Sequence, residues 1–140
     1  MRRFVLDACV AAKWYLDEEY SDAALHLAAS GPEWIAPDLF FAEVGIVLWE
    51  KVRRGEMDEA DARDAMTGLL SMELKVRDTS SLVLYGLELA LHFQCTVYDG
   101  LYLAAAIDEA SPLVTADRKF YRTFSESALG NHLLWIEDAI

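Results

Sequence analysis

Short apolar runs alternate with longer segments of helical periodicity along the chain. The apolar runs end at polar or turn residues, as buried parallel strands commonly do. The expected strands cover residues 3–7, 33–37, 73–78, 112–116 and 132–138. Because helical segments separate these strands, the pattern predicts an α/β fold, with a parallel or mostly parallel central sheet and helices on both faces.

The segments between the strands carry apolar residues at helical spacing. Ser21 and Asp38 are expected N-caps, because their side-chain oxygens suit the first turn of a helix. The expected helices lie within residues 10–17, 21–29, 38–55, 57–72, 80–93, 97–110 and 117–124. The chain has 140 residues and no repeats, which predicts one domain over residues 1–140.

The charge balance is strongly acidic. Lys and Arg number 12 against 24 Asp and Glu, a net charge of −12. Such a surface argues against broad electrostatic binding of nucleic acid, because phosphate contacts require positive charge. It does not exclude a nucleic-acid substrate that is bridged by metal ions. Hydrophobic residues make up 54% of the chain, which argues against disorder.

The cysteines and the longest apolar runs indicate the compartment. Cys9 and Cys95 have neither the spacing of a metal site nor the number of a disulfide framework. We therefore expect a reducing cytoplasm. Every apolar run falls short of the ~18 residues of a membrane span, so no membrane association is expected.

Most acidic residues lie in solvated runs, but Glu43 does not. Its helical neighbours at three and four residues' distance are Leu39, Phe40, Ile46 and Val47, all apolar. A carboxylate on such a face must be paired, protonated or bound to a metal ion. A salt bridge to an arginine elsewhere, or a position at the edge of the buried face, is the alternative to a functional role.

Three aspartates also lie at unusual places. Asp7 and Asp117 each follow an apolar strand, and each could instead be the N-cap of the next helix. Asp99 could belong to a capping box with Thr96. Together with Glu43, however, these residues could converge at one edge of the sheet. Converging carboxylates repel one another unless a cation lies between them, and oxygen ligands suit Mg²⁺ or Mn²⁺. Such a site can activate water and stabilise charge on a phosphodiester.

Four stretches resemble the PIN-domain ribonucleases of the VapC type, the toxins of toxin–antitoxin pairs. They are "FVLDACVAAKWYLDEE", "APDLFFAEVGIVLWEKVRRG", "TVYDGLYLAAAIDEASPLVTADRKF" and "LLWIED", in the order and at the separations of that family. The third is the most specific, because a Y-D-x-L-Y-x-A-x-A run precedes a short strand that ends in T-x-D. The resemblance covers nearly the whole chain.

The resemblance implies a PIN-like α/β/α sandwich that cleaves RNA endonucleolytically with Mg²⁺ or Mn²⁺. It also implies a homodimer and a small antitoxin protein that masks the site. The implied metal-binding and catalytic residues are Asp7, Glu43, Asp99 and Asp117.

Further residues are expected around this site. Thr115 matches the threonine of T-x-D and is expected to hydrogen-bond a ligand or a metal-bound water. Cys9 departs from the family pattern, which usually has Ser, Thr or Asn there; a thiol is a weaker hydrogen-bond partner. In an acidic protein, RNA must be attracted where cations gather, and the candidates are Arg118, Lys119 and Lys13.

Two other functions compete with this interpretation. A receiver domain also carries acids at strand ends, but it needs an acid pair near the first strand and a lysine near the last, and neither is present. A non-catalytic PIN-like module that binds a partner is the stronger rival. The four intact acids favour catalysis, whereas Cys9 is the one sequence feature that favours the rival.

Overall fold

The protein was analysed as a computed structural model that describes residues 2–139. Its five strands form one sheet in the order β3-β2-β1-β4-β5, and every neighbouring pair is parallel. The strands are β1 (Arg3–Leu6), β2 (Glu33–Pro37), β3 (Lys75–Arg77), β4 (Leu113–Thr115) and β5 (Leu133–Trp135). The predicted α/β class and parallel sheet are therefore confirmed.

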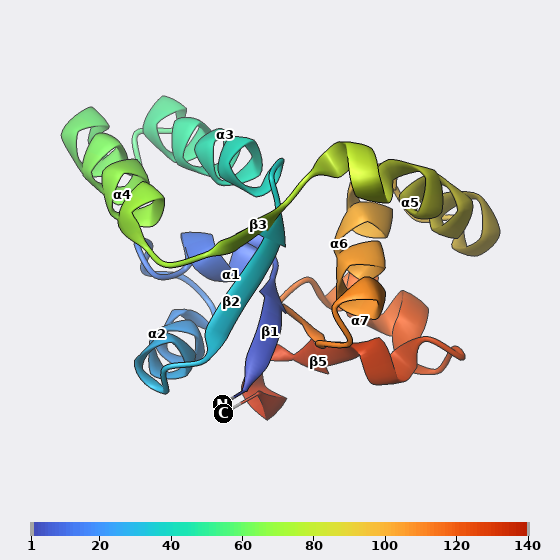
Figure 1. Ribbon diagram of the computed structural model, residues 1–140. Helices are drawn as coiled ribbons and strands as arrows, with labels where there is room; N and C mark the ends of the chain where they lie inside the picture. The colour runs from blue at the N-terminus through green and yellow to red at the C-terminus, as the bar shows by residue number, and fades with distance from the viewer. Residues whose placement is uncertain (1, 140) are drawn as a thin grey trace.

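Helices cover both faces of this sheet (Figure 1). One face carries α1 (Ala8–Ala12), α2 (Ser21–Ala29), α3 (Phe40–Arg53) and α4 (Glu59–Ser71). The other carries α5 (Thr79–Phe93), α6 (Val97–Asp108) and α7 (Arg118–Ser125), and the short 3₁₀ turns are η1 (Gly130–His132) and η2 (Ile136–Asp138). This is the predicted α/β/α sandwich. Within residues 2–139, no helix is long and apolar enough to cross a membrane.

Successive strands are added first on one side of β1 and then on the other. The chain first proceeds from β1 to β2 and β3, and it then returns to place β4 on the other side of β1. Val5 of β1 accordingly pairs with Ile35 of β2 and with Leu113 of β4. In parallel sheets ligands bind beyond the carboxyl ends of the strands at such a switch point. Asp7 and Asp117, which follow β1 and β4, both lie there.

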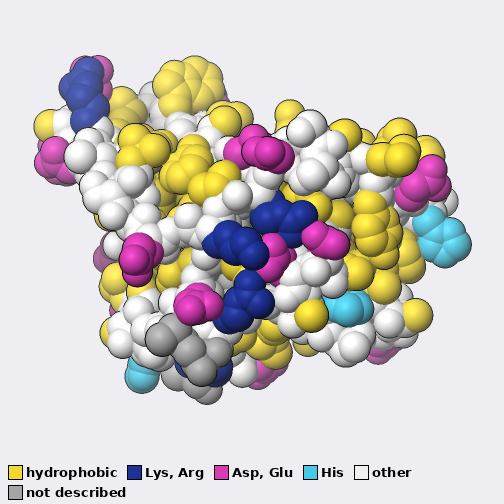
Figure 2. All heavy atoms as spheres, in the orientation of Figure 1, with side chains coloured by type: hydrophobic (Ala, Val, Ile, Leu, Met, Phe, Trp, Pro, Cys, Tyr) yellow, Lys and Arg dark blue, Asp and Glu magenta, His cyan; other side chains and the backbone are white. Residues whose placement is uncertain are grey.

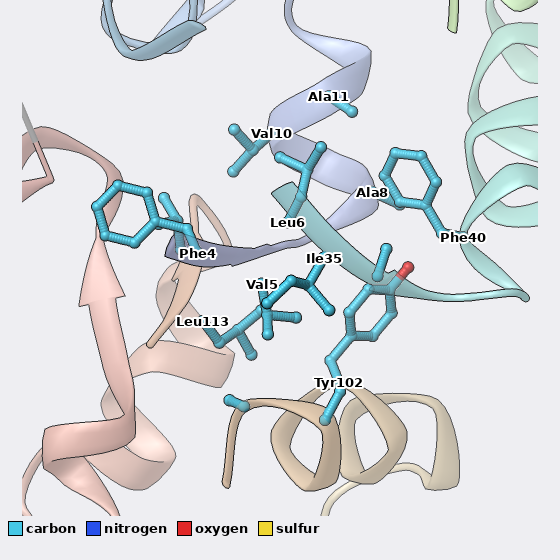
Figure 3. Close-up of a cluster of buried hydrophobic side chains, with 14 of the residues drawn as sticks. Phe4, Val5, Leu6, Ala8, Val10, Ala11, Ile35, Phe40, Tyr102 and Leu113 are labelled. Atoms are coloured by element: carbon cyan, nitrogen blue, oxygen red, sulfur yellow. The ribbon is translucent and has the colours of Figure 1, made fainter. Parts of the chain in front are cut away.

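The core fixes the central strands against both helical layers. Along β1 the side chains alternate between the faces of the sheet. Leu6 points toward Val10 and Phe40, whereas Val5 points toward Tyr102 of α6 (Figure 3). All of these side chains are buried. The carboxyl end of β1 is therefore held rigidly between the two layers.

Two glycines allow α5 and α6 to pack closely. A Cβ atom on Gly100 would lie 2.3 Å from the backbone oxygen of Gly86, which is closer than atoms can approach. The helices therefore meet backbone to backbone at this point. Because Gly100 follows Asp99, this contact also fixes the start of α6, where the acidic residue lies.

The bounds of one predicted helix and two predicted N-caps were wrong. The helix expected over 10–17 is the shorter α1, because the chain turns after Ala12 and the Trp14 indole N–H donates to the carbonyl of Ala24. Ser21 is not an N-cap: its hydroxyl donates to the carbonyl of Leu16 instead. Asp38 does not cap α3 either, because its carboxylate accepts from the backbone N–H of Thr79.

Candidate metal centre

The four predicted acids line one cavity at the carboxyl edge of the sheet. This cavity has a volume of about 260 Å³, and its lining includes Asp7, Glu43, Asp99 and Asp117. They come from the end of β1, from α3, from the first turn of α6 and from the residue before α7. Within residues 2–139, no three His, Cys, Asp or Glu side chains lie as close together as the ligands of one metal ion. The carboxylates thus share a cleft without forming a closed cage.

Asp7 is the most perturbed of these acids. Burial, together with the weaker effect of the charges of Asp99 and Asp117, raises the pKa of Asp7 to about 6, although hydrogen bonds from Thr115 and Cys9 oppose the rise. Asp7 occupies the N-cap position of α1, but its carboxylate makes no capping hydrogen bond. Helix capping, the alternative weighed for this residue, therefore does not account for its side chain.

Thr115 connects the two strand-end aspartates. Its hydroxyl donates to Asp7 Oδ2 at 2.8 Å and accepts from the backbone N–H of Asp117 at 3.0 Å. The side chain is fully buried. Because the single hydroxyl proton goes to Asp7, Thr115 does not donate to the Cys9 thiol 3.9 Å away. Burial and the charge of Asp7 raise the pKa of Cys9 well above its ordinary value, so the thiol stays neutral.

Glu43 reaches the cavity from α3 with one oxygen lacking a partner. Glu43 Oε1 and the hydroxyl of Tyr102 are both buried, and neither makes a hydrogen bond within the described chain. Burial raises the pKa of Glu43; the nearby Tyr102 hydroxyl opposes this rise, and the charges of Asp7 and Asp99 reinforce it. No arginine pairs with Glu43 among residues 2–139.

Comparison with known proteins identifies the family. A model of the PIN domain matches residues 4–124. This chain belongs to the PIN-domain family. Over 124 residues it is 32% identical to Ribonuclease VapC3 of Pyrobaculum aerophilum, a match that covers 87% of this chain and 95% of VapC3. The predicted VapC-type family is thereby confirmed.

Solved structures support the PIN fold independently. PAE2754 from Pyrobaculum aerophilum superposes with a TM-score of 0.69 at 22% identity, over 97% of this chain and 85% of that one. VapC20 from Mycobacterium tuberculosis, described as a sarcin-ricin loop cleaving toxin, gives a TM-score of 0.68 at 18% identity, over 86% of this chain and 95% of that one. At these identities the likeness concerns the fold alone.

Two of the acids in this PIN domain also act as parts of helix caps. Asp117 Oδ1 accepts from the backbone N–H of Phe120 at 3.1 Å, so the capping interpretation holds for this residue. The Thr96 hydroxyl accepts from the backbone N–H of Asp99 at 3.0 Å, as half of the predicted capping box. Burial raises the pKa of Asp99. Capping fixes the position of both residues and leaves carboxylate oxygens facing the cleft.

The predicted basic contacts of the PIN domain lie in different surroundings. Lys119 lines a second cavity together with Asp99 and Asp117. The guanidinium of Arg118 instead lies 5.2 Å from the ring centre of Trp135. Lys13 Nζ is 3.0 Å from Glu18 Oε1. Neither Arg118 nor Lys13 lines the acidic cavity.

Tyr102 is the side chain at this site that sequence reasoning missed. It is buried, and its hydroxyl is close enough to the acids that their charges add to the effect of burial in raising the pKa of Tyr102. The signal was present in the sequence, because Tyr102 follows Asp99 by three residues and therefore lies on the same side of α6.

The chemistry of this donor set fits a hard divalent cation. All four cavity acids offer oxygen atoms, which Mg²⁺ and Mn²⁺ prefer. The unsatisfied Glu43 Oε1 is a buried acceptor that lacks a donor or a cation. Burial is the main cause of the raised pKa of Asp7, and the charges of Asp99 and Asp117 add to it; a cation between the carboxylates relieves both effects.

Proposed function

We propose that this PIN domain is a metal-dependent endoribonuclease of the VapC toxin type. One observation carries the proposal: four carboxylates from separate elements line a single cleft at the topological switch point of the sheet. Unpaired carboxylates gathered in this way destabilise the fold unless they serve a cation. The 32% identity to Ribonuclease VapC3 supports RNA as the substrate.

The proposed metal-binding residues differ in how the fold holds them in place. Thr115 orients Asp7 and fixes the backbone of Asp117, so these two acids are preorganised. Glu43 and Asp99 approach from the helices of opposite layers and complete an oxygen ligand set for Mg²⁺ or Mn²⁺. When bound, such an ion supplies an activated water and offsets charge on the phosphodiester. Lys119 contributes the positive charge that attracts the RNA backbone near the cleft.

We further propose that the protein acts in the cytoplasm, as a homodimer that is neutralised by a small antitoxin. A structural neighbour of 18% identity is the VapBC2 complex of Rickettsia felis, and its fold likeness accords with an antitoxin partner. The α5 helix exposes hydrophobic side chains, with Leu84 73% and Leu91 68% accessible, where a second copy could cover them (Figure 2). Cys9 and Cys95 are both free thiols, which suits a reducing compartment.

The direct test is RNA cleavage by the wild type and by Asp7→Asn, with Mg²⁺ and with a chelator. We expect cleavage by the wild type in Mg²⁺, and its loss both on chelation and in the variant. Cleavage that survives chelation, or full activity of Asp7→Asn, would refute the proposal.

A non-catalytic partner-binding module is the alternative function. Cys9 supports it, because its thiol replaces the stronger hydrogen-bonding group that the family usually has beside the first aspartate. Titration calorimetry with Mn²⁺ separates the two functions. Binding of Mn²⁺ supports the nuclease, whereas no binding at millimolar Mn²⁺ supports the module.

A further inference from the structure

A second cavity opens directly beside the acidic one. It has a volume of about 530 Å³, within the roughly 300–1,000 Å³ usual for small-ligand sites. Glu43, Asp99 and Asp117 line both cavities, so the two share a wall at the carboxylates. A group bound in the second cavity would therefore lie next to a phosphodiester that is held at the acids.

The remaining lining of this cavity differs in chemistry from the acidic one. Tyr98, in the first turn of α6, is 61% exposed and directly precedes Asp99. Gln94 contributes an exposed amide, which can both donate and accept hydrogen bonds, and Thr123 contributes a hydroxyl. The acidic cavity contains no aromatic side chain and no amide among its lining residues.

This combination matches the requirements of an unpaired nucleotide. Exposed aromatic rings provide platforms on which bases stack, and amide side chains read the hydrogen-bonding edges of bases. Lys119 lines the same cavity as Tyr98 and Asp99. A lysine in a cavity that also contains an exposed aromatic ring and the proposed metal-binding carboxylates can contact the phosphate that joins two nucleotides.

We propose that this cavity is the nucleobase subsite of the nuclease, with Tyr98 as stacking platform and Gln94 as a specificity-determining residue. The inference rests on the proposed ribonuclease function and extends it to the side chains that recognise a base beside the cleavage point. A base can stack on Tyr98 only when it is unpaired, because paired bases are already stacked within their helix. The identity of that base is then read at Gln94.

The kinetic test compares Tyr98→Ala with Tyr98→Phe, which keeps the ring and removes only the hydroxyl. For Tyr98→Ala we expect KM to rise about 5- to 150-fold, as loss of one stacked base predicts. Tyr98→Phe should stay within about twofold of the wild type in KM, as expected when the ring alone is needed. Gln94→Ala should broaden the set of cleaved sequences. Wild-type cleavage with an unchanged KM and an unchanged cleavage pattern in Tyr98→Ala and Gln94→Ala would overturn the subsite.

A binding measurement tests the subsite even if no cleavage is found. A short fluorescent single-stranded RNA is titrated with the wild type and with Tyr98→Ala, with Ca²⁺ in place of Mg²⁺, because Ca²⁺ also takes oxygen ligands. We expect Tyr98→Ala to bind more weakly by the same factor, and we expect the RNA to lose affinity for the wild type when it is annealed to its complement. Equal binding by both proteins, or equal binding of single-stranded and duplex RNA, contradicts the subsite. Absence of wild-type cleavage alone contradicts the proposed ribonuclease.

Discussion

The two ends of α6 hold carboxylates in opposite electrostatic surroundings. At its start, Asp99 faces a cleft with three further acids. Just beyond its end, the largely buried Glu109 is surrounded by cations, with Arg3, Lys75 and Arg77 all within 2.8–2.9 Å. Figure 2 shows this second kind of arrangement, with Lys and Arg side chains gathered around acidic ones over the middle of the face.

The pKa values follow from these surroundings. Burial raises the pKa of Glu109, but hydrogen bonds from Lys75, Arg3 and Arg77 outweigh burial and leave it below its ordinary value. Burial raises the pKa of Asp7 to about 6 without any such cation. The Glu109 end has the form of a structural ion-pair network, whereas no lysine or arginine forms an ion pair with Asp7 among residues 2–139. This contrast is what we expect if the acids at the Asp7 end serve the proposed metal site and Glu109 serves the fold.

Asp7→Asn should give the largest effect on activity. Because several kcal/mol of metal-derived stabilisation are lost, we expect cleavage to fall about 1,000-fold.

In the absence of metal, Asp7→Asn should be more stable than the wild type at neutral pH. The pKa of Asp7 is raised to about 6 in the fold, so burial of its charge costs stability as pH rises above the unfolded value of 3.8. Denaturant unfolding should show a gain of roughly 1–3 kcal/mol at neutral pH, vanishing below about pH 4. Equal unfolding free energies of Asp7→Asn and the metal-free wild type at neutral pH would contradict this account, because they would mean that the buried charge of Asp7 costs no stability.

Gly100→Ala should destabilise the fold at the acidic end of α6. The new methyl group would collide with the backbone of Gly86, and overpacking of this kind costs about 1–3 kcal/mol in unfolding free energy. Gly45→Ala is the matched control in α3, because its methyl would meet only Met66, at an ordinary 3.5 Å. We expect that control to stabilise the protein by about 0.5–1 kcal/mol through helix propensity. Equal unfolding free energies for the two variants would refute the close contact.

Glu109→Gln should destabilise the paired end of α6 without changing metal binding. Removing the carboxylate leaves Arg3, Lys75 and Arg77 without their shared partner, at a cost of about 1–2 kcal/mol in unfolding free energy. Because the folded pKa of Glu109 is lowered, the wild-type advantage exists above about pH 4.5 and disappears as pH falls through the folded pKa. If Glu109→Gln loses Mn²⁺ affinity, as Asp7→Asn is expected to do, the proposed difference between the two ends of α6 is refuted.

Tyr102→Phe should have the smallest effect. The Tyr102 hydroxyl opposes the rise in the pKa of Glu43, so its removal raises that pKa further. Metal ions bind the deprotonated carboxylate, and removal of a polar group beside a metal ligand costs about tenfold in metal affinity. Calorimetry with Mn²⁺ at neutral pH measures this change, and the deficit should shrink at higher pH. A pH-independent deficit would indicate a packing defect instead.

The sequence predicted the fold well where hydrophobic periodicity carries the information. All five strands and the parallel sheet followed from apolar runs such as residues 112–116. Helix ends were predicted less well, because tertiary hydrogen bonds decide them. The carboxylate of Asp38, for example, accepts from Thr79, which lies 41 residues away in sequence.

The convergence of the acids could be predicted from strand ends and from the apolar neighbours of Glu43. The sequence could not show which of these acids caps a helix with its side chain, because Asp7 and Asp117 have the same local pattern. The structure separates them: Asp117 caps α7, whereas the Asp7 carboxylate accepts from Thr115 across the switch point. The contrast between Glu109 and Asp7 also depends on residues from different strands, which sequence spacing does not reveal.

The central claim is that the four carboxylates of the cleft require a divalent cation. Thermal unfolding with increasing Mn²⁺ tests it directly, in the wild type, Asp7→Asn and Glu109→Gln. Because a ligand that binds only the native state stabilises it by about 2.7 kcal/mol at 100 times its Kd, we predict a Tm that rises with Mn²⁺ in the wild type and in Glu109→Gln. Asp7→Asn should show almost no rise. A wild-type Tm that is unchanged at millimolar Mn²⁺ would contradict the account.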